Sequence, residues 1–225
     1  MISLCIPTKA RPSIFKRMCL SALDNAFDPN NIEFVSYREN VDKSVYEYFG
    51  NHQEIIGDGG AISRKVNECQ AIATGDIYMM ISDDFVFETK GWDKAVEEVF
   101  NEYPDKIVMV WPDDKCYRSS FGQSMFLHRN WVETVGYFAA PYFVAQFIDN
   151  WWNDVANIIN RKHFLRHTVV KHYCVADDDT HREHMKMNKE FNSKALYRSP
   201  EMQIKREEDA KKLQEFIDNW SSDNE

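Results

Sequence analysis

The sequence lacks the glycine motifs that mark the two commonest kinds of nucleotide site. No G-x-G-x-x-G follows the first apolar run, and no G-x-x-x-x-G-K-[ST] occurs among the 225 residues. These motifs let the backbone approach phosphates in dinucleotide-binding and P-loop proteins. Their absence excludes both classes. Nucleotidyl transfer, which needs a glycine-rich basic loop after the first strand, is disfavoured because residues 7–11 contain no glycine.

Cysteine is scarce and long apolar runs are missing. The five cysteines are scattered without a C-x-x-C pair, namely Cys5, Cys19, Cys69, Cys116 and Cys174. This pattern is typical of reduced thiols in a cytosolic protein. No apolar run approaches the ~18 residues of a membrane span. The chain opens on an apolar stretch without a basic leader, which predicts a strand rather than a signal peptide. We therefore expect a cytoplasmic protein without a membrane anchor.

Positive charge is also in deficit. Lysine and arginine number 27 against 36 acidic residues, giving a net charge of −9. A general nucleic-acid binder usually presents a basic face, so this class is disfavoured. Residues 161–171 nevertheless form a local basic run. It either balances nearby acids or meets an anionic acceptor.

What the sequence does contain is an alternation of short apolar runs with segments of helical period. Strands are predicted at residues 2–6, 32–37, 54–56, 77–82, 107–111, 126–127 and 168–170. Helices are predicted from an N-cap at Ser13, at 43–49, 63–73, 91–100, 131–135 and 143–159, and from Pro200 onward. Strands that alternate with helices indicate parallel βαβ units. The expected class is α/β, a mostly parallel sheet flanked by helices.

The composition changes near residue 176. A polar stretch begins at 177–180, and a final helix carries one apolar stripe, formed by Leu213, Phe216, Ile217 and Trp220. A stripe of this kind packs on another element. Residues 176–225 are thus expected to be a C-terminal extension ending in an amphipathic helix.

The most informative stretch is an apolar run that ends in two adjacent carboxylates, Asp83 and Asp84. Two acids at one strand end repel each other unless a cation lies between them. Other polar residues follow earlier strands and are expected at the same edge of the sheet, namely Thr8, Arg11, Arg38, Glu39 and Asp58. Acids for base or ribose, cations for phosphate and glycines for close approach together predict a nucleotide site.

Three segments, taken in order, resemble a known family. Residues 2–8 form an apolar strand closed by Pro7 and Thr8, residues 67–77 lead through Gly75 into the next strand, and residues 82–84 end that strand in acids. This order is similar to the family-2-type glycosyltransferases of GT-A fold. The resemblance covers residues 1–93 well and continues more loosely to about 175. It implies a GT-A domain over 1–175, with a nucleotide-sugar half (1–93) and an acceptor half (94–175).

The resemblance implies roles for particular residues. Asp84 and His172 would hold Mn²⁺ or Mg²⁺, and Asp149 would be the general base if the reaction inverts the anomeric centre. The donor, a nucleotide-diphosphate sugar and most plausibly a UDP-sugar, would be bound by Pro7, Thr8, Arg11, Arg38, Asp58, Arg64 and Asp83. Lys65 is a further candidate for phosphate or base. An Asp/His pair leans toward Mn²⁺, since Mg²⁺ prefers oxygen ligands.

The chain departs from the family pattern in three places, and several alternatives stay open. The first acid of a strict D-x-D is replaced by Ser82, Asp149 precedes Asn150 rather than a second acid, and the second strand ends at residues 38–40 without the common Asp-rich turn. A catalytically dead sugar-nucleotide-binding module would have the same motifs. The acceptor could be a metabolite, a glycan, a protein or, as in phage-type enzymes, a modified DNA base. Small size without an anchor is typical of minimal phage or bacterial enzymes.

Side chains outside these motifs have both ordinary and functional interpretations. Trp111, Trp151 and Trp152 could pack in the core or stack on a sugar. The pairs His163/His167 and His181/His184 have helical spacing but no partnering cysteines, so we interpret them as surface residues.

Overall fold

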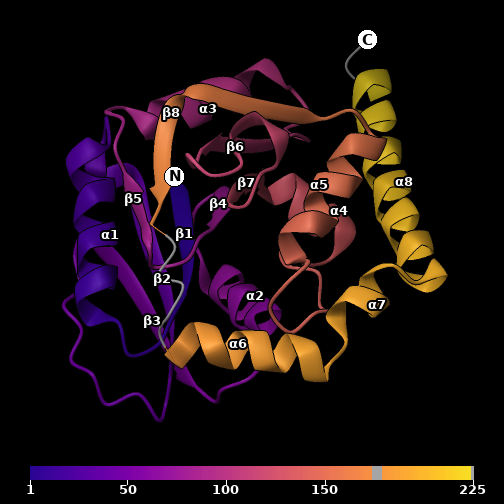
Figure 1. Ribbon diagram of the computed structural model, residues 1–225. Helices are drawn as coiled ribbons and strands as arrows, with labels where there is room; N and C mark the ends of the chain where they lie inside the picture. The colour runs from indigo at the N-terminus through magenta and orange to yellow at the C-terminus, as the bar shows by residue number, and fades with distance from the viewer. Residues whose placement is uncertain (174–178, 224–225) are drawn as a thin grey trace.

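The computed structural model describes residues 1–173 and 179–223, which form one mixed sheet flanked by helices (Figure 1). Cys174, Asp177 and Asp178 lie outside the described residues. The eight described strands run in the order β3-β2-β1-β4-β7-β6-β8-β5. They are β1 Ile2–Thr8, β2 Ile32–Glu39, β3 Asn51–Gly57, β4 Ile77–Met80, β5 Phe85–Phe87, β6 Met109–Asp113, β7 Met125–His128 and β8 Lys162–His172.

The first half of the sheet is parallel and the second half is mixed. Strands β3, β2, β1 and β4 are all parallel, so their carboxyl ends meet at one edge. Strand β7 is antiparallel to both β4 and β6, β8 is parallel to β6, and β5 is antiparallel to β8. The predicted class, a mostly parallel α/β sheet, is confirmed.

Helices cover both faces of the sheet (Figure 1). The helices are α1 Pro12–Asn25, α2 Ile62–Ile72, α3 Trp92–Glu102, α4 Arg129–Val135, α5 Ile148–Ile158, α6 Asp179–Glu190, α7 Ser193–Tyr197 and α8 Pro200–Asp223. One apolar cluster lies with α1 and α3, and a second lies with α2, α4, α5 and α8. Adjacent residues of β1 face opposite sides of the sheet: Leu4 belongs to the first cluster and Cys5 to the second. Burial on both faces accounts for its continuous apolar run.

Several sequence predictions need correction. Residues 43–49 form no helix, because Asp42 fixes this segment as a loop: its carboxylate accepts hydrogen bonds from Ala10 N–H (2.8 Å), Ser44 N–H (2.9 Å) and the Tyr46 hydroxyl (2.8 Å). Helix α1 begins at Pro12 without a side-chain cap, so Ser13 is not the N-cap. Helix α5 begins only at Ile148. The segments β5, α6 and α7 were not anticipated.

The final helix packs as its apolar stripe predicted. Leu213 and Ile217 are buried in the cluster with α4 and α5, whereas Trp220 remains partly exposed. Asp209 adds a polar anchor, because its carboxylate accepts hydrogen bonds from Trp151 Nε1 (3.0 Å) and the Tyr137 hydroxyl. Helix α8 thereby braces α5 (Figure 1). No helix among the described residues is long and apolar enough to cross a membrane.

Gly75 joins α2 to β4 at a point with no space for a side chain. A Cβ there would lie 2.5 Å from the Met1 carbonyl oxygen and 2.5 Å from Ser3 Oγ. The Gly75 N–H also donates to Ser3 Oγ at 3.0 Å. We therefore expect Gly75→Ala to force the start of β1 away and to destabilise the fold by about 1–3 kcal/mol. Urea unfolding measures this, and an unchanged midpoint would show that the chain relaxes without cost.

Candidate active site

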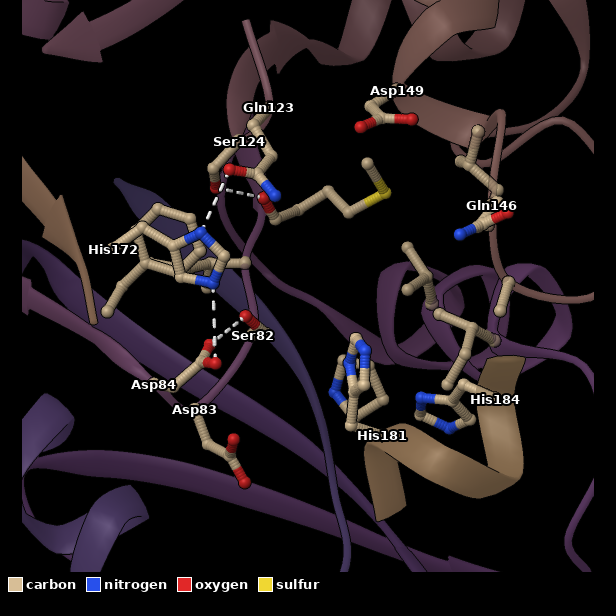
Figure 2. A pocket seen from close by; sticks show the side chains of 18 of the residues that line it. Ser82, Asp83, Asp84, Gln123, Ser124, Gln146, Asp149, His172, His181 and His184 are labelled. Atoms are coloured by element: carbon tan, nitrogen blue, oxygen red, sulfur yellow. Dashed lines mark hydrogen bonds and ion pairs between the residues drawn. The ribbon is translucent and has the colours of Figure 1, made fainter. Parts of the chain in front are cut away.

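The carboxyl edge of the parallel strands opens into a cavity of about 870 Å³. Its walls come from the segments after β1 and β4, the 121–124 segment before β7, the first turn of α5, the end of β8, and α6. Among the residues expected from sequence to act together, the lining includes Pro7, Thr8, Arg11, Lys65, Asp83, Asp84, Asp149 and His172. Segments distant in the chain therefore meet at one cavity, as Figure 2 shows for ten of the lining residues.

The two adjacent carboxylates point to different partners. Asp83 accepts hydrogen bonds from Thr8 Oγ1 at 2.7 Å and from Arg11 Nη1 at 3.0 Å, which ties the end of β4 to the segment after β1. Burial raises the pKa of Asp83 to about 6; the Thr8 hydrogen bond and the Arg11 charge oppose this rise, and the Asp84 charge adds to it. Asp83 thus fixes Thr8 and Arg11 in the cavity lining.

Asp84 faces His172 instead. Its Oδ2 lies 3.3 Å from His172 Nε2, and its Oδ1 accepts a hydrogen bond from the Ser82 hydroxyl (Figure 2). The pairing of β5 with β8 brings the two residues together, because Phe85, next to Asp84, pairs directly with His172. The two residues are far apart in the sequence, and the β5–β8 pairing together with the hydrogen bond from Tyr173 N–H to the Asp84 carbonyl (3.0 Å) brings them into contact.

The donor set of Asp84 and His172 fits a divalent cation in part. Adjacent ligands of an octahedral ion with bonds of ~2.1 Å lie ~3 Å apart, close to the observed 3.3 Å between Oδ2 and Nε2. Across residues 1–173 and 179–223, no three His, Cys, Asp or Glu side chains gather as a metal site. A cation held here would therefore need further oxygens from a bound ligand or water.

Asp149 lies in the first turn of α5, on the same cavity. Phe147, immediately before the helix, adopts a left-handed backbone conformation (φ 74°), which turns the chain so that the helix starts at the cavity. Burial raises the pKa of Asp149 to about 6, against the opposing hydrogen bonds of nearby backbone N–H groups. A carboxyl with such a pKa is largely ionised at neutral pH yet more basic than an exposed one.

A chain of alternating charges closes one side of the cavity. Buried Lys65 lies 2.5 Å from Glu39, Lys9 lies 2.8 Å from the same carboxylate, and Lys9 also reaches Glu183 of α6 at 2.7 Å. Lys9 follows β1, Glu39 ends β2 and Lys65 lies in α2, so the network connects the ends of two neighbouring strands and α2 to helix α6. Lys9 therefore links α6 to the segment after β1.

Helix α6 adds two histidines to the cavity lining. His181 and His184 were interpreted as surface residues; His181 is exposed and His184 is partly buried, and both face the cavity (Figure 2). Burial lowers the pKa of His184, and the charges of Lys65, Arg11 and Lys9 lower it further. The spacing of the two histidines was visible in the sequence, but the helix that places both of them at the cavity was not predicted.

Three expected donor contacts are not brought to the cavity. Arg38 forms a salt bridge with Glu54 at 3.0 Å, and Arg64 with Glu68 at 2.7 Å. Asp58 accepts a hydrogen bond from the Asn40 side chain at 2.8 Å. Asp58 follows β3, Arg38 lies near the end of β2, and Arg64 lies in α2. Strands β3 and β2 form one end of the sheet, and the three side chains bond to residues near them there. None of the three lines the cavity among the described residues.

The remaining candidates, three tryptophans and the basic run at 161–171, lie in the core or away from the cavity, apart from the end of β8. Trp111, Trp151 and Trp152 are buried in the core cluster, which supports the packing interpretation. In the basic run, Arg161 pairs with Asp105 at 3.1 Å. In the described part of the chain, only His172 brings this end of β8 to the cavity lining; residues 161–171 contribute nothing to it.

Comparison with known proteins supplies the fold. No protein-family model and no curated protein matches the chain. Among solved structures, TarS 1–349 of S. aureus in complex with UDP matches with a TM-score of 0.57 at 10% identity, covering 76% of this chain and 60% of that one. The Pyrobaculum calidifontis mannosyltransferase PcManGT, in complex with GDP-Man and Mn²⁺, matches with a TM-score of 0.59 at 13% identity, covering 88% and 64%. The fold is that of GT-A-like nucleotide-sugar glycosyltransferases.

The resemblance inferred from residues 2–8, 67–77 and 82–84 is thus confirmed at the level of the GT-A-like fold. The chain spans 60% of the TarS fragment and 64% of PcManGT. At 10% and 13% identity, the likeness establishes the fold and leaves the reaction to be argued from the site. Helices α6, α7 and α8 follow β8: α6 contributes to the cavity lining, and α8 lies alongside α5 (Figure 1).

Proposed function

We propose that the protein transfers a sugar from a nucleotide-diphosphate sugar to an acceptor hydroxyl, with a divalent cation at Asp84 and His172. The observation that carries this proposal is the single cavity on which Asp83, the Asp84–His172 pair and Asp149 all lie. Structural neighbours in complex with UDP and with GDP-Man and Mn²⁺ support the class of donor. Of the residues expected to bind the donor, Pro7, Thr8, Arg11, Lys65 and Asp83 line this cavity and are the proposed donor contacts.

In the proposed reaction, Asp149 accepts the proton of the acceptor hydroxyl on a carboxylate oxygen. The hydroxyl oxygen bonds to the anomeric carbon, and the bond from that carbon to the diphosphate oxygen breaks with its electron pair. Attack opposite the leaving group inverts the anomeric centre. A cation bound by Asp84 and His172 supplies charge neutralisation for the departing diphosphate. Arg11 and Lys65 add positive charge along the wall next to Asp83 and Glu39.

The first test is a thermal-shift panel of UDP, GDP, UDP-sugars and GDP-sugars, each with and without Mn²⁺. A ligand that binds only the folded state at 100 times its Kd stabilises by about 2.7 kcal/mol, or about 5–10 °C for a chain of this size. We expect a shift of this order for at least one nucleoside diphosphate, and a larger one with Mn²⁺. Uridine and guanosine, which lack the diphosphate, are the matched controls.

No shift with any nucleoside diphosphate would overturn the proposed function. A shift without release of nucleoside diphosphate from the matching sugar donor would instead favour a binding module over an enzyme. Release that needs Mn²⁺ would support the enzyme.

A further inference from the structure

The position of His172 is fixed by contacts of both its ring and its backbone. Its ring stacks on Phe85 with centroids 4.3 Å apart and an interplanar angle of 3°. Its backbone N–H donates to the Asp114 carbonyl at 3.1 Å, and its Nδ1 lies 2.9 Å from Gln123 Oε1 (Figure 2). The other ring nitrogen, Nε2, faces Asp84. The ring therefore has one orientation, and its two nitrogens have different tasks.

Gln123 is itself fixed by its neighbours on both sides. The Asn153 side-chain amide of α5 accepts from Gly122 N–H at 3.0 Å and donates to the Gly122 carbonyl at 2.8 Å. Gly122 packs so closely on Trp111 that a Cβ would lie 3.0 Å from its ring. On the other side, the Ser124 hydroxyl donates to the Met80 carbonyl. Gln123 is thus presented to His172 from a rigid segment.

An amide oxygen accepts hydrogen bonds and does not donate them, so Gln123 Oε1 pairs with a protonated Nδ1. In the neutral ring, this leaves the lone pair on Nε2, pointing at Asp84. A metal ligand must offer a lone pair, and its second nitrogen is commonly fixed by an outer hydrogen-bond acceptor that sets tautomer and orientation. Gln123 occupies this place at His172.

We propose that Gln123 is a positioning residue for the cation: it holds the His172 tautomer whose Nε2 lone pair faces the space shared with Asp84. This inference rests on the proposed function, which puts the cation at Asp84 and His172. Gln123 acts through His172 and needs no contact with donor or acceptor. Losing such an outer partner typically costs about 10- to 100-fold in metal affinity.

The test measures Mn²⁺ affinity directly, by the loss of the free-ion electron paramagnetic resonance signal in titrations with and without saturating UDP or GDP, whichever shifts the melting temperature. Gln123→Met keeps the size of the side chain and removes the acceptor, so we expect a loss of about 10- to 100-fold in Mn²⁺ affinity. Gln123→Glu keeps an acceptor at the same reach, so its affinity should stay within a few-fold of wild type. Gln146→Met makes the same change at another glutamine that lines the cavity (Figure 2), and it should leave Mn²⁺ affinity unchanged.

The outcomes separate the inference from the proposed function. If His172→Ala loses Mn²⁺ but Gln123→Met binds as wild type, the inference is wrong and the cation site stands. If Gln123→Glu falls as far as Gln123→Met while both melt like wild type without metal, a role through the acceptor oxygen is also wrong. If His172→Ala binds Mn²⁺ as wild type, or wild type binds none, the cation site itself is wrong and the inference falls with it.

Discussion

Asp149→Asn is expected to reduce the release of nucleoside diphosphate from the sugar donor by about 10²- to 10⁴-fold, the usual contribution of a general base. The amide has nearly the same shape as the carboxyl but cannot take the acceptor proton. Asp149 lies on the first turn of α5, away from the Thr8–Asp83–Arg11 cluster that we assign to the donor. Donor binding should therefore persist, and the thermal shift with nucleoside diphosphate should match wild type.

The control for this variant is Asp154→Asn on the same helix. Asp154 pairs with Arg206 at 3.3 Å and accepts a hydrogen bond from the Tyr197 hydroxyl, and it does not line the cavity in the described structure. The Asp154→Asn variant tests whether removing any negative charge from α5 lowers turnover. Near-normal turnover in Asp149→Asn would show that another group, or none, takes the proton.

The same residue predicts a pH dependence. Burial raises the pKa of Asp149 to about 6, and only the ionised carboxylate can accept a proton. Turnover should therefore be maximal above pH 7 and fall tenfold per pH unit below about pH 6. In Asp149→Asn this acid limb should disappear from the residual rate, which a pH–rate profile of both proteins would show.

The parts of the fold that were predictable are those in which local sequence and burial agree. Strand β1 is apolar on both faces because helices cover both, and it ends at Thr8 where the polar edge begins. The Asp83–Asp84 pair likewise comes after an apolar strand, β4, at the polar edge of the sheet. The four buried residues of α1, which include Phe15 and Met18, recur with helical period. In each case the pattern of apolar residues along the chain shows which positions are buried.

The parts that were missed depend on contacts between distant segments. Strand β5 has three residues and exists because β8 pairs with it, and that pairing delivers His172 to Asp84. Helix α6 is mainly polar, so its sequence shows no apolar stripe that would predict where it packs. The Lys9–Glu183 ion pair, which joins segments far apart in the chain, links it to the rest of the protein. Residues 43–49 have helical spacing, yet the hydrogen bonds to Asp42 prevail. Nothing in the local sequence around Gln123 indicates its partner on β8.

Asp84→Asn tests the cation site at its other ligand. A neutral amide loses the charge that attracts a divalent cation, whereas its oxygen keeps nearly the same position. Since even outer-shell partners are worth about 10- to 100-fold, we expect Mn²⁺ affinity to fall by more than about 100-fold. Turnover at fixed Mn²⁺ should fall with it, because the departing diphosphate loses the charge that neutralises it. Paramagnetic resonance titration and product release measure the two effects on one sample.

Asp83→Asn is the matched control, because it makes the same change one residue earlier. In the wild-type protein the Asp83 carboxylate bonds to Thr8 and Arg11, whereas the Asp84 carboxylate faces His172. Asp83→Asn should therefore keep Mn²⁺ affinity within a few-fold of wild type and weaken binding of the nucleoside diphosphate, since Arg11 loses its partner. If Asp83→Asn loses Mn²⁺ and Asp84→Asn keeps it, the two carboxylates have the opposite assignment. If both lose Mn²⁺ equally, the pair binds the cation together and the division of roles between them is wrong.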